Sequence, residues 1–116
     1  MWDVVQVRDT IKLYVQERQQ IIASFLPKLR ELRTSLENCS VFAAHEFVRT
    51  SLLLVYSNAT NCTTVHIIDL TRVTELLNGK VINHRDEWTP GNHEDGYLLG
   101  LDNLIKTFEE VHESLA

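Results

Sequence analysis

Two apolar runs around a short polar loop constrain the fold of this chain more than any other feature. The first run is Phe47–Tyr56, apolar through its second half, and the second is Val65–Asp69. Apolar and β-branched residues fit a pleated, buried surface, so each run is typical of a strand. With the polar residues 57–62 between them, the runs predict an antiparallel hairpin. A hairpin alone is only marginally stable, so helices or further strands must cover it.

A single carboxylate, Asp69, ends the second predicted strand. A side chain that follows a buried strand is a common place for ligand binding in α/β and α+β enzymes. In the predicted hairpin Ser51 lies toward the same end as Asp69, and two oxygen ligands there would begin a metal site. The alternative is structural, since an aspartate can start a turn by bonding its own backbone two residues on. These residues alone leave both interpretations open.

Helical patterns precede the hairpin. We expect one helix near residues 7–23 and a second near 25–38, or a single kinked helix, because Pro27 is tolerated only in a first turn and Ser24 is a suitable N-cap. The first carries an apolar stripe that starts at Val4, and the second carries Phe25, Leu29, Leu32 and Leu36 on one face. The basic residues between them (Lys28, Arg30 and Arg33) indicate a solvated face rather than an anion site.

A long helix is predicted at the C-terminus. Asn92 is a suitable N-cap, and Glu94 and Asp95 would place negative charge on the first turn, where the helix dipole favours it. An apolar stripe then runs to the end of the chain: Tyr97, Leu98, Leu101, Leu104, Ile105, Phe108, Val111 and Leu115. Residues 70–91 have no clear period, so we expect an irregular loop that Trp88 packs onto the body. The predicted fold is therefore α+β: two N-terminal helices, an antiparallel hairpin, an irregular loop and a C-terminal helix.

Composition narrows the functional classes. A chain of 116 residues makes one domain or a piece of one, and its net charge of −5 argues against a general nucleic-acid binder. No apolar run approaches the roughly 20 residues that span a bilayer. Two cysteines without CxxC spacing and an N-terminus without a signal-peptide core favour a cytoplasmic or nuclear location.

Three stretches resemble the inositol polyphosphate kinases, and most closely the C-terminal half of the catalytic domain of the inositol 1,4,5-trisphosphate 3-kinases. Residues 45–53 match the family's "HE..GSSLL", and Val65–Leu70 match the strand that ends in "IDF". Residues 83–88 and 91–105 match "HR..W..GN.EDGYL.GLDNLI" almost letter for letter. The likeness extends from about residue 7 to residue 112, so residues 1–116 are expected to form a single partial domain of a protein-kinase-like, SAICAR-synthase-like fold.

The resemblance implies a phosphotransferase that uses ATP and Mg²⁺ and acts on a hydroxyl of an inositol phosphate, most closely inositol 1,4,5-trisphosphate. Asp69 would take the role of the kinase "DFG" aspartate and hold Mg²⁺ against the ATP phosphates, with Ser51 as a further polar ligand to metal or nucleotide. Phosphoryl transfer depends mainly on charge neutralisation, and Mg²⁺ needs only one or two protein oxygen ligands.

The chain also departs from the family. Arg49-Thr50-Ser51 stands where the family has Gly-Ser-Ser, and Asp69-Leu70-Thr71-Arg72 stands where it has Asp-Phe-Gly-Lys. Arg49 could point to solvent or crowd the nucleotide. The motif P-x-x-x-D-x-K-x-G, which supplies the family's catalytic aspartate, is absent from these 116 residues, so no catalytic residue is identified.

Two functional interpretations follow. In the first, the chain is part of an ATP-dependent inositol phosphate kinase, and alone it transfers no phosphate. In the second, it is a truncated or degenerate kinase-like protein that only binds a partner or pairs with itself through an uncovered strand edge or apolar patch.

Overall fold

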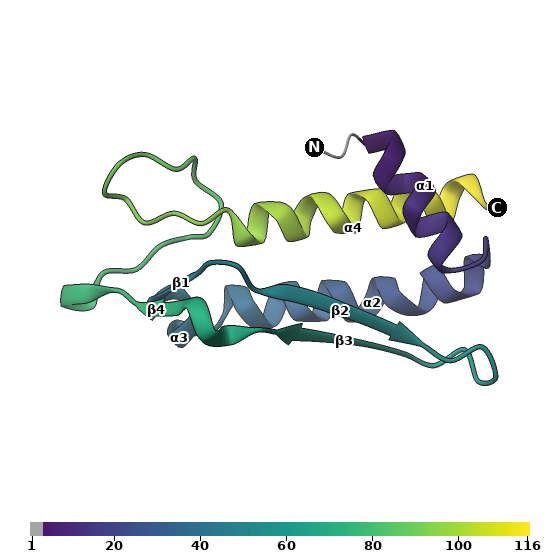
Figure 1. The fold of residues 1–116 in the computed structure, drawn as a ribbon, viewed down its shortest axis with the longest axis horizontal. Coiled ribbons are helices and arrows are strands. Elements are labelled where there is room, and N and C mark those ends of the chain that lie inside the picture. Colours follow the sequence, from purple (N-terminus) through teal and green to yellow (C-terminus); the bar gives the residue numbers. More distant parts are fainter. Residues whose placement is uncertain (1–3) are drawn as a thin grey trace.

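The computed structural model describes residues 4–116, with side chains from Gln6 onward. It has the predicted α+β architecture, in which two N-terminal helices, a hairpin and a C-terminal helix pack together (Figure 1). The elements are α1 (Val4–Tyr14), α2 (Gln19–Glu37), α3 (Ser40–Ala43), β1 (His45–Phe47), β2 (Ser51–Tyr56), β3 (Thr63–Ile68), η1 (Leu70–Arg72), β4 (Val73–Glu75), η2 (Leu77–Gly79) and α4 (Tyr97–Ser114). None of the helices in this described part is long and apolar enough to cross a membrane.

The core lies between α2, α4 and the inner face of the β2–β3 hairpin (Figure 1). Phe25 of α2 is completely buried and makes edge-on ring contacts with Phe108 of α4 and Tyr56 of β2. The predicted stripes are therefore the core faces of both long helices, as helical spacing requires. In α4 the buried members are Leu98, Leu101, Ile105, Phe108 and Val111.

The break between the N-terminal helices is not where the sequence pattern placed it. The chain leaves α1 after Tyr14, and Gln16 and Glu17 adopt left-handed backbone angles. Helix α2 runs from Gln19 to Glu37 with Pro27 inside it instead of in its first turn, so the break predicted between residues 23 and 25 is wrong. Both Pro27 and Ala23, whose carbonyl loses its helical partner, are exposed, and water can hydrogen-bond that carbonyl.

Ser24, predicted as an N-cap, is an interior residue of α2, and its hydroxyl pairs with the Thr63 hydroxyl at 2.7 Å. The side chain of Val4, first in the predicted stripe, lies outside the described residues, whereas Val15 and Ile22 of that stripe are fully buried. The contact between Ser24 and Thr63 therefore joins α2 to β3 at a position where a helix start was expected.

The predicted hairpin is present, but it is longer and interrupted. Strands β2 and β3 pair antiparallel from Ser51↔Ile68 to Tyr56↔Thr63. Past the open end of this hairpin a second antiparallel pair forms between β1 and β4, with Phe47 opposite Val73. The predicted strand Phe47–Tyr56 is thus divided, with Phe47 at the end of β1 and Ser51–Tyr56 in β2, and part of the predicted irregular loop is the short strand β4.

The C-terminal helix begins later than predicted, at Tyr97. Gly96 has φ 68°, a left-handed conformation that ends any continuous helix reaching back to Asn92. Asn92 is therefore not the N-cap; its side chain holds a turn by accepting the Glu94 amide and donating to the Glu87 carbonyl. Trp88 is 63% exposed, so the prediction that it packs the loop onto the body is also wrong.

Candidate functional site

The candidate site lies where the two strand ladders are interrupted. Regular pairing ends at Ser51↔Ile68 on one side and at Phe47↔Val73 on the other. Between these pairs residues 48–50 face residues 69–72, and we call these seven residues the ladder interruption. An interruption releases side chains and backbone groups from the ladder and exposes them, and such irregularities are common beside active sites.

Asp69 is exposed and has left-handed backbone angles of φ 63° and ψ 64°, which aspartate tolerates better than most residues. Its carboxylate makes no hydrogen bond to the backbone of η1. The structural alternative, in which Asp69 starts a turn by bonding its own backbone two residues on, is therefore wrong. Instead, the Thr71 hydroxyl donates to Oδ1 at 3.1 Å. No other hydrogen bond or ion pair to this carboxylate is present within residues 4–116, which leaves it able to accept a cation.

Ser51 lies at the same end of the hairpin as Asp69, as the sequence predicted. It is the first residue of β2 and pairs with Ile68, the residue before Asp69. Its side chain is exposed. The register therefore brings the two predicted ligands to one edge, while their roles toward metal and nucleotide stay predictions.

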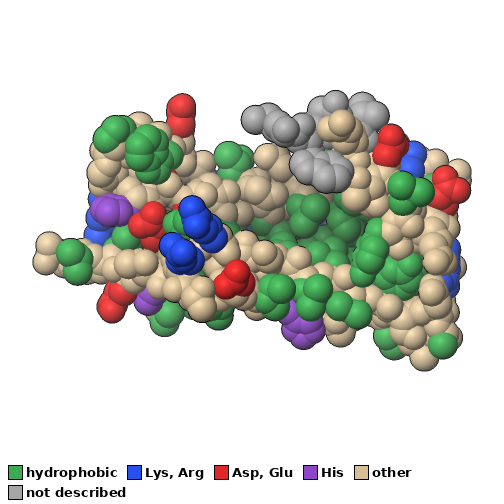
Figure 2. Space-filling view, in the orientation of Figure 1, with side chains coloured by type: hydrophobic (Ala, Val, Ile, Leu, Met, Phe, Trp, Pro, Cys, Tyr) green, Lys and Arg blue, Asp and Glu red, His purple; other side chains and the backbone are tan. Residues whose placement is uncertain are grey.

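Two arginines, Arg49 and Arg72, belong to the same interruption. Every other arginine of the described chain hydrogen-bonds a side chain, whereas no such contact is present for these two. Arg49 is exposed, so of the two alternatives that its sequence position raised, the structure has the one in which it points to solvent. Basic side chains gather over this part of the surface (Figure 2). A carboxylate and two cations without side-chain partners in one interruption suit a metal-bound polyanion.

A buried pair that sequence reasoning missed holds the β1 side of the interruption. His84 and Asp95 have side chains only 1% exposed, and the His84 Nδ1 atom lies 2.7 Å from both Asp95 carboxylate oxygens. The same carboxylate accepts the backbone amides of Phe47 at 2.8 Å and Tyr97 at 2.9 Å. Burial acts to raise the pKa of Asp95, but the hydrogen bonds from His84, Tyr97 and Phe47 outweigh it and hold that pKa below its usual value.

Glu94 and Asp95 were predicted as charges on the first helical turn. Both precede α4, so that position is wrong, but Asp95 accepts the first amide of the helix, that of Tyr97. Glu94 accepts the backbone amides of Asn83 and His84, at 3.1 and 2.9 Å. The next two amides of α4 are satisfied by a backbone carbonyl, because Leu98 and Leu99 both donate to the His84 oxygen. These residues belong to the "HR" and "ED" segments of the family motif. The spacing of the two segments does not reveal which residues pair.

The basic residues of α2, predicted to form a solvated face, also contact residues of α4 and β3. Arg33 contacts Asp102 of α4 at 3.3 Å, and Arg85 makes a two-bond contact with the same carboxylate at 2.7 and 3.0 Å. The Arg85 guanidinium is the main cause that lowers the pKa of Asp102. Arg30 pairs with Glu109, and Lys28 donates to the Thr63 carbonyl. These contacts join α2, α4 and β3.

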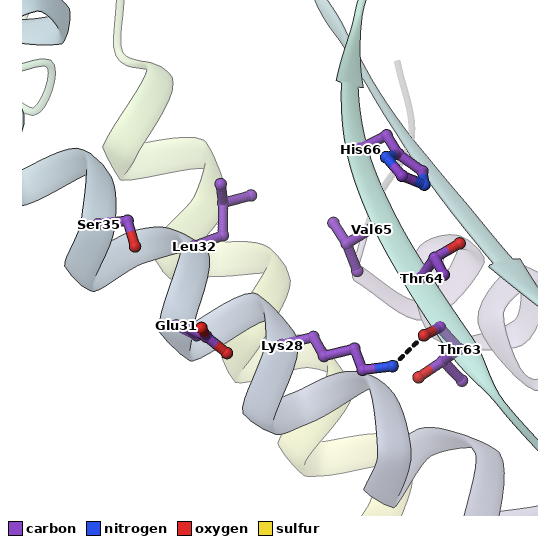
Figure 3. Close-up of a pocket in the computed structure, with 8 residues that line it drawn as sticks. All are labelled: Lys28, Glu31, Leu32, Ser35, Thr63, Thr64, Val65 and His66. Atoms are coloured by element: carbon purple, nitrogen blue, oxygen red, sulfur yellow. Dashed lines mark hydrogen bonds between the residues drawn. The ribbon is translucent and has the colours of Figure 1, made fainter.

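A groove with a volume of about 390 Å³ runs between α2 and β3 (Figure 3). It is lined by Lys28, Glu31, Leu32 and Ser35 of α2 and by residues 63–66 of β3. The Lys28 ammonium group is held at one end by the Thr63 carbonyl. Since the groove holds mixed charges, with neither Asp69 nor Ser51 in its lining, it does not form part of the candidate site.

Comparison with known proteins identifies the family of this chain. The family model described as "Inositol polyphosphate kinase" matches residues 2–109, so the chain belongs to the inositol polyphosphate kinase family.

The individual relatives that the chain resembles are inositol-trisphosphate 3-kinases. The chain is 39% identical to human inositol-trisphosphate 3-kinase A over 108 residues, which are 93% of this chain and 23% of that protein. It is 38% identical to an inositol-trisphosphate 3-kinase homolog of Caenorhabditis elegans, over 84% of this chain and 19% of that one. With mouse inositol-trisphosphate 3-kinase C the identity is also 38%, over 94% and 16%. The chain thus spans less than a quarter of the length of these relatives.

Proposed function

We propose that this chain supplies the Mg²⁺-binding half of an ATP-dependent inositol phosphate kinase site. The observation that carries the proposal is the position of Asp69, exposed at the ladder interruption with one carboxylate oxygen unpartnered in the described chain. The family membership supports phosphoryl transfer as the reaction, and inositol trisphosphate as its acceptor is the substrate named in the relatives.

In this proposal Asp69 is the carboxylate ligand of Mg²⁺ and Ser51 contributes a hydroxyl. Mg²⁺ retains several waters and typically takes one or two protein ligands besides the substrate phosphates, so two oxygens at one edge satisfy its needs from this side. The ion neutralises charge on the ATP phosphates, which is the main requirement of phosphoryl transfer. Thr71 orients the Asp69 carboxylate through its 3.1 Å hydrogen bond.

The chain alone is proposed to be inactive. The P-x-x-x-D-x-K-x-G motif, which by family resemblance supplies the catalytic aspartate and a substrate lysine, does not occur in the 116 residues. Purified chain mixed with Mg²⁺-ATP and inositol trisphosphate is expected to transfer no phosphate. Measurable turnover by the isolated chain would contradict this part of the proposal.

A chimera tests the proposed function itself. The matching 108 residues of human inositol-trisphosphate 3-kinase A are replaced by the corresponding part of this chain. The chimera is expected to phosphorylate inositol trisphosphate, and Asp69→Asn is expected to lower its rate at least about a hundredfold, because a neutral amide is a poor Mg²⁺ ligand. Asp86→Asn, an exposed loop substitution, is the matched control. A folded chimera with no activity, or one indifferent to Asp69→Asn, would refute the proposal.

A second candidate function is binding without catalysis, and one observation favours it. The outer face of the hairpin exposes Leu53, Val55 and Ile68 to between 40% and 43%, and hydrophobic side chains also gather in a hollow between α4 and the hairpin (Figure 2). Exposed apolar patches mark docking surfaces. Sedimentation of the isolated chain distinguishes the cases: association that Leu53→Lys abolishes supports this candidate, and a compact monomer at all concentrations excludes self-pairing.

A further inference from the structure

The atoms around His84 determine its protonation state. The Nε2 atom lies 2.8 Å from the Phe42 carbonyl oxygen, which can only accept a hydrogen bond, so Nε2 must carry a proton. The Nδ1 atom faces the Asp95 carboxylate. Both Asp95 oxygens accept backbone amides, from Tyr97 and Phe47, and these bonds help to hold the pKa of Asp95 below its usual value, so near neutral pH the carboxylate is ionised and can only accept hydrogen bonds. Nδ1 must therefore carry a proton as well.

The ring contacts agree with a charged imidazolium. The His84 ring stacks on Phe42 with the centroids 3.7 Å apart and the planes inclined by 16°. The face of an aromatic ring attracts a cation, and the attraction is strongest where water is excluded. Because the side chains of His84 and Asp95 are each only 1% exposed, the positive ring has both its counter-ion and an aromatic face inside the protein.

The pair connects four segments. Through Asp95 it fixes the amide of Phe47 in β1, and through the ring it fixes the carbonyl of Phe42 in α3. Asp95 accepts the first amide of α4, that of Tyr97, and the His84 carbonyl accepts the next two. Phe47 of β1 lies opposite Val73 of β4, and the ladder resumes there after the interruption. The position of β1 therefore determines where the chain re-enters the ladder after residues 69–72.

We propose that His84 is a buried imidazolium paired with ionised Asp95, and that these two are positioning residues for the Asp69 site. The other ionisable groups near the ring do not replace Asp95: Glu94 bonds the backbone amides of Asn83 and His84, Tyr97 is a neutral phenol, and Arg85 is paired with Asp102 and Glu37. The step from the pair to metal binding rests on the proposed function, whereas the protonation state does not.

The first measurement uses the unmodified chain. In ¹⁵N-labelled protein at about pH 7.5, where an exposed histidine is mostly neutral, His84 is expected to show protons on both ring nitrogens. A His84 ring with one bare nitrogen at that pH would overturn the proposal.

The second measurement tests positioning. In Asp95→Asn the Phe47 amide is expected to exchange with solvent at least about tenfold faster than in the wild type, because local opening becomes easier. Asp86→Asn is the control and should leave the rate unchanged. The same variant should weaken Mn²⁺-ATP binding if the pair positions the site. A wild-type chain that binds no Mn²⁺-ATP refutes the proposed function and leaves the protonation result standing; unchanged exchange and unchanged binding in Asp95→Asn refute positioning.

Discussion

Arg49 and Asp69 adopt left-handed backbone conformations on the two facing sides of the same ladder interruption, with φ values of 58° and 63°. The two residues explain why the hairpin does not continue as one regular ladder from β1–β4 into β2–β3. An aspartate enters this region of backbone space with little penalty, whereas an arginine has no side-chain group that compensates. Position 49, where the family has glycine, therefore also carries backbone strain.

We predict that Arg49→Gly stabilises the chain by up to about 1 kcal/mol, because glycine adopts positive φ without steric cost. Arg72→Gly is the matched control: this arginine is also exposed and in the interruption, but its backbone is not left-handed, so glycine there should lower stability. Urea unfolding of both variants measures the difference. A loss of stability in Arg49→Gly would show that the arginine side chain contributes more than its backbone costs.

Stability is expected to fall in acid through the two carboxyls whose pKa values lie below normal, Asp95 and Asp102. Each binds a proton more weakly in the folded than in the unfolded chain. Its contribution is therefore present above the ordinary carboxyl pKa of about 4 and is lost as the pH drops through the lower folded pKa.

Urea unfolding measured at several values from about pH 6 to pH 2.5 tests this dependence. Asp95→Asn should lower stability at neutral pH and flatten the acid limb of the curve. An Asp95→Asn variant whose stability has the same pH dependence as that of the wild type would contradict this prediction.

Phe25 is expected to be among the residues most sensitive to truncation. It is fully buried and its ring joins α2 to both Tyr56 and Phe108. Phe25→Ala should cost roughly 3–5 kcal/mol, since removing a buried aromatic ring leaves a cavity. Leu13→Ala, at a position 78% exposed, should stay within about 0.5 kcal/mol. Equal effects of the two substitutions would mean that the described core is not the one that stabilises the chain.

The sequence predicted the parts of the fold that rest on a period. The stripe of α4 and the alternation of β2 and β3 are local patterns, and each appears as buried and exposed faces in the structure. The helix break was wrong because Pro27 acts through one hydrogen bond, and its effect depends on whether water reaches the Ala23 carbonyl. No local pattern reports that exposure.

The candidate site was predictable in its register and not in its surroundings. Counting along two strands was enough to place Ser51 beside Asp69. The contact of Asp95 with Phe47 and with His84 could not be read from the chain, because it joins residues far apart in sequence. A carboxylate before a helix has an obvious local explanation as a cap, and that explanation concealed the long-range one.

The most direct test of the account is whether Asp69 binds the metal of a metal–nucleotide complex. Paramagnetic Mn²⁺ with ATP is titrated into ¹⁵N-labelled chain, and the loss of each amide signal is followed. We expect weak binding, with the signals of Ser51 and Asp69 among the first to broaden, and we expect Asp69→Asn, but not Asp86→Asn, to abolish the effect. Broadening centred on another part of the chain, or broadening that persists in Asp69→Asn, would contradict the assignment of Asp69 as the metal ligand.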